Sequence, residues 1–295
     1  MANLSKVLIS AVEGNAQWLD GGAMFGNAPR ALWERWAKPD SLGRIRLACR
    51  AMLVEMDDIK ILCETGIGAY MEPALAQRYG VEGREHRLLE SLKTLGLSPD
   101  DIDYVILSHL HFDHAGGLLP SYEERQQGNS GLLFQKARFV VGKEAWERSV
   151  HPHARDRASF IPELTKLLVE SGRLDLVSGP HIPGLDPARI QVRFSSGHTP
   201  GQMHTLVKGD RETFYFAGDL VPGKAWVHLP VTMGYDRFAE QVIDEKQALY
   251  KEAVPGGWHL FFTHDTDLAA ARVQQDDKGR YGTFEELSSP QRYVI

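Results

Sequence analysis

The chain has 295 residues, a formal net charge of −6 at pH 7 and 43% hydrophobic residues, enough for one sizeable core. The acidic balance and the lack of a Lys/Arg-rich run argue against a nucleic-acid-binding protein. No stretch approaches the roughly 18 apolar residues of a membrane span, and the first apolar patch is too short for a secretory signal. We therefore expect a cytoplasmic protein without a membrane or nucleic-acid partner.

The first half of the chain predicts strands and helices in alternation. The apolar run at residues 60–65 is the first clear strand signal, and four leucines between positions 88 and 95 have helical spacing before a glycine stop. Residues 104–107 predict a short buried strand that leads directly into the segment SHLHFDHAGG at residues 108–117. The polar residues 122–131 are interpreted as a surface insertion, and apolar alternation resumes at residues 137–141.

The second half repeats this alternation. It predicts a strand at residues 190–194, a hairpin over 205–216 that turns at Gly209 and Asp210, a helix over 237–253 and a strand at 259–262. Neither half contains a linker of low complexity. We therefore expect one α/β domain over residues 1–295.

The segment 108–117 has the character of a metal site. His109 and His111 are two residues apart after a strand, so their side chains project to the same side. Asp113 and His114 follow in a turn that the glycines allow. Four ligand-type side chains so close together beside an apolar strand favour divalent metal binding over a solvated histidine-rich loop.

Further ligand-type residues occur at the ends of later strands. His198 follows the strand at 190–194 within GHTPG, Asp219 follows the hairpin, and His264 follows the strand at 259–262. Each residue alone is more often structural. Their shared position at strand ends favours a common metal centre, because strand ends are where α/β sheets place their sites.

The motif HxHxDH, followed in order by the GHTPG histidine, a strand-end aspartate and a late histidine, resembles the metallo-β-lactamase superfamily along essentially the whole chain. The resemblance implies an α/β (α+β) fold of the αββα type, with two mixed sheets face to face, helices outside and two divalent ions at one edge. The implied ions are zinc, with iron, manganese or cobalt as alternatives. The implied ligands are His109, His111 and His198 on the first ion, Asp113, His114 and His264 on the second, and Asp219 bridging both.

This resemblance also implies a mechanism. A hydroxide held between the ions would attack the substrate, and Asp113 and Asp219 are the expected catalytic carboxylates. Where many members have DTG, this chain has Glu64 before Thr65 and Gly66, a longer carboxylate that we expect to support a metal ligand from behind.

Two stretches resemble the quorum-quenching N-acyl-homoserine lactonases of the YtnP type: residues 19–26, and residues 218–222 with their continuation to 236. The resemblance implies a lactonase with Met24, Phe25 and Phe112 against an acyl chain. Met24 and Phe25 could equally pack a core or a dimer contact.

The best-studied lactonases carry a tyrosine three residues after the bridging aspartate, where this chain has Pro222. The group that binds the lactone must then come from elsewhere, and His228 and Tyr235 are the candidates. The alternatives to a lactonase are a phosphotriesterase of the methyl-parathion-hydrolase type, a thioesterase and a non-catalytic metal-binding interaction protein. A small ester or lactone is the expected partner, and a homodimer through residues 21–47 is expected by analogy.

Overall fold

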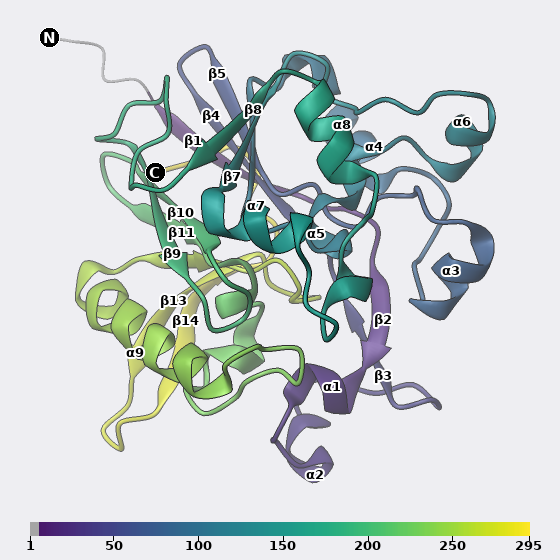
Figure 1. The fold of residues 1–295 in the computed structure, drawn as a ribbon. Helices are drawn as coiled ribbons and strands as arrows, with labels where there is room; N and C mark the ends of the chain where they lie inside the picture. Colours follow the sequence, from purple (N-terminus) through teal and green to yellow (C-terminus); the bar gives the residue numbers. More distant parts are fainter. Residues whose placement is uncertain (1–5) are drawn as a thin grey trace, which may run out of the picture.

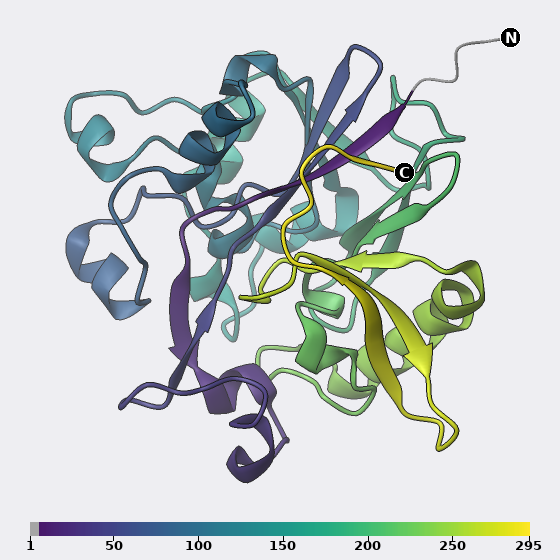
Figure 2. The same cartoon turned by 180° about the vertical axis from the view of Figure 1, so that it is seen from behind.

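The computed structural model describes residues 6–295 and contains two mixed β-sheets that pack face to face (Figures 1 and 2). The first sheet has the order β15-β1-β4-β5-β6-β7-β8, and its strands from β5 to β8 are parallel. In chain order its strands are β1 (Val7–Val12), β4 (Ala51–Met56), β5 (Ile59–Cys63), β6 (Tyr104–Leu107), β7 (Arg138–Gly142), β8 (Leu174–Val177) and β15 (Tyr293–Val294).

The second sheet has the order β14-β13-β12-β11-β10-β9, in which only the β11–β12 pair is parallel. Its strands are β9 (Ile190–Ser195), β10 (Gln202–Lys208), β11 (Thr213–Phe216), β12 (His259–Phe261), β13 (Ala270–Gln275) and β14 (Tyr281–Leu287). β2 (Gln17–Asp20) and β3 (Arg44–Leu47) pair as a separate two-stranded sheet. The segment of the chain that connects them contains the short helices α1 (Gly21–Phe25) and α2 (Arg30–Trp33). We call residues 17–47 the arm.

Successive side chains along each strand point to opposite faces of its sheet, and this alternation produces the layers of the fold. In β6, Val105 and Leu107 belong to a core shared with outer helices, whereas Ile106 points into the core between the two sheets. In β11, Phe214 enters the inter-sheet core and Tyr215 the core beneath α9. The helices of the first outer layer are α4 (Arg87–Thr94), α7 (Lys143–Val150) and α8 (Leu164–Glu170), and α9 (Ala239–Gly256) covers the second sheet. The predicted αββα sandwich is confirmed.

The remaining short helices are α3 (Pro73–Arg78), α5 (Phe112–Ala115) and α6 (Tyr122–Gln126). No helix within residues 6–295 is both long enough and apolar enough to cross a membrane.

Most elements expected from the sequence are present with shifts of one to three residues at their ends. The polar segment 122–131 is not wholly irregular, because Ser121 and Glu124 form a capping box that starts α6. The sequence pattern did not predict the strands β1 to β4, β8 and β13 to β15. β1 is a short apolar run that becomes a strand because β4 and β15 pair with its two edges.

Candidate metal centre

The seven predicted ligands lie together at one edge of the sandwich, and each follows the end of a strand. Four of them come from the first sheet, because the segment after β6 carries His109, His111, Asp113 and His114. The second sheet contributes the other three, located between β9 and β10, after β11 and after β12: His198, Asp219 and His264. The centre therefore spans the boundary between the two sheets.

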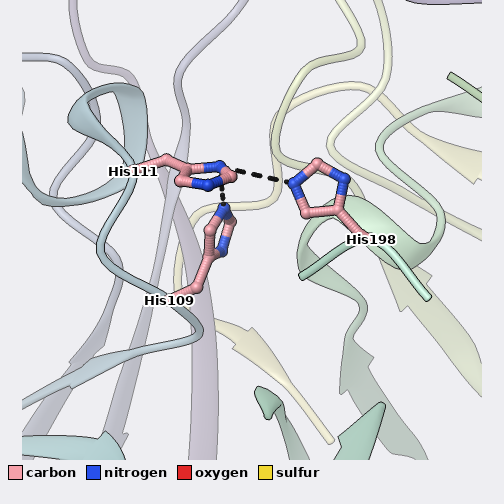
Figure 3. A group of neighbouring side chains, drawn as sticks. All are labelled: His109, His111 and His198. Carbon is pink, nitrogen blue, oxygen red and sulfur yellow. Dashed lines mark hydrogen bonds between the residues drawn. The ribbon is translucent and has the colours of Figure 1, made fainter. Parts of the chain in front are cut away.

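Three imidazole rings form the first cluster, His109, His111 and His198 (Figure 3). His109 Nε2 lies 2.9 Å from His111 Nδ1, and His198 Nε2 lies 3.4 Å from the same atom. Two nitrogens bound to one tetrahedral zinc ion at 2.0–2.1 Å are separated by about 3.3 Å, so this spacing fits a metal ion. Burial and the neighbouring imidazoles hold the pKa of His109 and of His111 well below the ordinary value, which keeps both rings in the neutral form that binds metals.

The second cluster comprises Asp113, His114 and His264. His114 Nε2 lies 3.7 Å from Asp113 Oδ1, and His264 Nε2 lies 3.7 Å from Asp113 Oδ2. His114 Nε2 is buried, and none of its contacts among the described residues, the nearby Asp219 Oδ1 included, has hydrogen-bond geometry. Such an orphaned nitrogen is rare in a folded core unless an ion or a water satisfies it, so the residues present fit a second metal ion.

Asp219 connects the two clusters through its two different oxygens. Oδ1 lies 3.3 Å from His114 Nε2 and 3.2 Å from His264 Nε2, whereas Oδ2 lies 3.3 Å from His198 Nε2. Burial alone would raise the pKa of Asp219, but the imidazoles around it hold that pKa well below its usual range. The carboxylate is therefore ionised and faces both clusters.

Two carboxylates hold imidazole rings of the centre by contacting Nδ1, the ring nitrogen that faces away from Asp219. Glu64 Oε2 lies 2.7 Å from His114 Nδ1, and Asp236 Oδ1 lies 2.8 Å from His198 Nδ1. A carboxylate in this position selects the tautomer whose other nitrogen is free for a metal ion. Glu64 occupies a left-handed backbone conformation with φ of 72°. Its other oxygen, Oε1, accepts a hydrogen bond from the Ser108 backbone N–H, which ties β5 to the start of the motif.

Other supporting contacts come from distant parts of the chain. Gln17 Nε2 donates to Asp113 Oδ2 at 2.7 Å, and His264 Nδ1 lies 2.6 Å from the Ala48 carbonyl oxygen. The buried Arg50 guanidinium donates to three carbonyls around His264, those of Phe262, Asp265 and Leu268. Sequence reasoning missed Gln17, Arg50 and Asp236. Of these three residues, only Asp236 could have been found from the sequence, since it lies within one of the two stretches that resemble lactonases.

A cavity of about 350 Å³ lies over the metal centre. Three of the five predicted substrate residues, Met24, Phe112 and Tyr235, line it. Leu19 and Met233 extend this apolar wall. The cavity is therefore shaped by the arm on one side and by residues 233–237 on the other.

The other two predicted substrate residues, Phe25 and His228, do not line this cavity, which corrects the sequence interpretation. Phe25 is fully buried, and its ring stacks on Trp33 at 5.6 Å and on Trp226 at 4.6 Å between ring centres. Successive helical residues point about 100° apart, so Met24 reaches the cavity while its neighbour packs the core of the arm. His228 contacts Trp36 and lines a different cavity, which lies between the arm and β14.

Residues 44–127 match the family model described as the metallo-β-lactamase superfamily. The N-acyl homoserine lactonase AiiA of Bacillus thuringiensis subsp. kurstaki is 28% identical over 168 residues, which cover 54% of this chain and 58% of the relative. The match thus spans little more than half of the relative's length.

Two solved structures are similar over nearly the whole chain. A probable metal-dependent hydrolase from Staphylococcus aureus has a TM-score of 0.84 and 24% identity, and covers 99% of this chain and 100% of its own. AidC, a dizinc quorum-quenching lactonase in complex with a product, has a TM-score of 0.71 and 18% identity, with 99% of this chain and 97% of its own covered. Residues 44–127 thus resemble the metallo-β-lactamase superfamily in sequence, and the αββα fold, with its cluster of His and Asp side chains at the sheet edge, is shared with both solved structures.

Proposed function

We propose that this protein is a lactonase that opens N-acyl homoserine lactones at a centre of two divalent ions. The position of Asp219 carries the proposal, because its two oxygens face two separate groups of ligand atoms. The similarity to the B. thuringiensis lactonase and to the dizinc lactonase AidC supports this substrate class. Zinc fits the histidine and carboxylate ligands, and iron, manganese and cobalt accept the same set.

The protein itself sets the protonation of the proposed ligands before any ion binds. The neutral rings of His109 and His111 offer lone pairs without first losing a proton. Although burial lowers the pKa of His114 and of His264, the nearby carboxylates, Asp219 foremost, raise both well above the ordinary value, which marks a place that attracts positive charge. When bound, the two ions would supply an activated water and a Lewis acid for the ester carbonyl.

The cavity explains how a lactone would be held. Leu19, Met24 and Phe112 offer an apolar wall to an acyl chain, worth about 0.8 kcal/mol for each buried methylene. Tyr235 lines the same cavity, and burial raises the pKa of its hydroxyl, which therefore stays protonated and able to donate to the lactone. Tyr235 would thus replace the tyrosine that is absent at position 222. The Pro222 carbonyl has a different task, since it accepts the backbone N–H of His264 at 2.8 Å.

The test is a hydrolysis panel on metal-loaded protein with N-acyl homoserine lactones, thioesters, phosphotriesters and β-lactams. We expect the lactones to have the highest kcat/KM and elemental analysis to approach two ions per chain. Tyr235→Phe should raise KM or lower kcat for lactones, with Tyr281→Phe, outside this cavity, as the control. Fast turnover of a phosphotriester or thioester with inert lactones would reject the lactonase and leave a hydrolase of another class.

A further inference from the structure

Two arginines share the cavity with the metal ligands. Arg155 lies in the loop after α7, and Arg237 lies just before α9. They come from the two different sheet layers of the sandwich and meet at the same opening. The mechanism proposed above uses neither of them.

Neither guanidinium is neutralised by a carboxylate in the part of the chain that the structure describes. The acidic neighbour of each one is engaged elsewhere: Asp156 pairs with Arg148 at 2.7 Å, and Asp236 pairs with His198 at 2.8 Å. The Nε atom of Arg237 is buried and has no hydrogen-bond partner within residues 6–295. Buried polar groups are normally satisfied, so this atom indicates a missing ligand.

Both arginines are held beside the first cluster. The backbone N–H of Arg237 donates to the His198 carbonyl at 3.1 Å. Nη2 of Arg155 donates to the Gly234 carbonyl, which links its loop to the segment before α9. These contacts use one guanidinium nitrogen of Arg155 and leave the others free for a ligand.

We propose that Arg155 and Arg237 bind a permanent anionic group of the substrate, a carboxylate on the acyl chain away from the ester that is cleaved. The proposal rests on the lactonase function and narrows its substrate class. Guanidinium groups match a carboxylate with paired, charge-assisted hydrogen bonds. The chain as a whole is acidic, with a net charge of −6, so an anionic substrate requires a local concentration of positive charge.

The experiment compares two substrates that differ only at the end of the chain, N-hexanoyl and N-adipoyl homoserine lactone. We expect the wild type to prefer the adipoyl substrate in kcat/KM by about tenfold, the scale of two partly exposed ion pairs. The double variant Arg155→Gln, Arg237→Gln should bring this ratio close to one. Added salt should lower the ratio in the wild type, because it screens charges at an open rim. Arg211→Gln, an exposed arginine in the β10–β11 turn, is the matched control and should keep the wild-type ratio.

The outcomes separate the two proposals. If both lactones are inert while another ester class is turned over, the lactonase function fails. If both lactones are cleaved but the ratio is near one, or stays the same in the double variant, the anion site is refuted. Should the double variant fail to fold, Arg155→Gln alone decides, because that side chain is exposed and donates only to backbone carbonyls. A carboxylate effect seen only as product inhibition would assign the arginines to the newly formed acid and also overturn the proposal.

Discussion

Replacing Asp236 by asparagine exchanges one carboxylate oxygen for an NH₂ group next to His198, a proposed metal ligand. Both oxygens of Asp236 accept hydrogen bonds, Oδ1 from His198 Nδ1 at 2.8 Å and Oδ2 from the Met233 backbone N–H at 2.7 Å. An asparagine has a single oxygen. If that oxygen faces Met233, the amide N–H₂ forces His198 Nδ1 to become an acceptor, which places the proton on the nitrogen that would bind the metal.

The opposite orientation of the amide is also unfavourable, because it leaves the buried Met233 N–H without an acceptor, at about 1–3 kcal/mol. Loss of such a supporting carboxylate typically weakens metal binding by about 10–100-fold, which corresponds to about 1.4–2.7 kcal/mol. We expect Asp236→Asn to fall in this range, with zinc affinity measured by competition with a chelator. Asp156→Asn is the matched control, since this buried aspartate pairs with Arg148 and no ligand histidine. Equal zinc affinity in wild type and Asp236→Asn would refute the role assigned to Asp236.

Three further predictions follow from the site and its surroundings. Asp219→Ala should reduce bound metal well below two ions per chain by elemental analysis, whereas His151→Ala, at an exposed position, should not. Phe25→Ala should lower the free energy of unfolding by about 3–5 kcal/mol in denaturant titrations yet keep the dependence of KM on acyl-chain length, a dependence that Met24→Ala should weaken. Burial lowers the pKa of Lys246 to about 7, against about 10.4 in an unfolded chain, so the unfolded state binds more protons between these values. The stability of the wild type relative to Lys246→Met should therefore rise from pH 7 towards about pH 10, and a difference that does not vary with pH would contradict this shift.

The elements with strong local patterns were predictable. The leucines of α4 and the apolar run of β6 are visible in short windows of sequence, and both elements are present. β14 was not predictable in the same way, because its residues are mostly half-exposed and its pairing partner β13 defines it as a strand. Backbone pairing of this kind depends on neighbours that a local window does not contain.

The same distinction between local patterns and distant contacts applies to the candidate metal centre. The spacing within residues 108–117 and the strand-end position of Asp219 predicted residues that the structure brings together, because metal chemistry constrains the types of the proposed ligands strongly. The support from Gln17 reaches Asp113 across 96 positions, and that from Arg50 reaches Phe262 across 212. Likewise, nothing in the sequence distinguishes Met24, at the cavity, from Phe25, inside the arm, since only the direction of each side chain separates them.

The division of the ligands between the two sheets has a consequence for the lifetime of the folded chain. Four of the proposed ligands follow β6 in one sheet and three follow strands of the other, so a bound ion would hold the sheets against each other. An ion that binds only the assembled sandwich stabilises it by an amount that grows with its free concentration, about 2.7 kcal/mol at 100 times the dissociation constant. A low concentration of free metal would then have two effects on this protein. It would remove the catalytic activity, and it would lower the free energy of unfolding, so that the chain unfolds and is cleaved by proteases more readily.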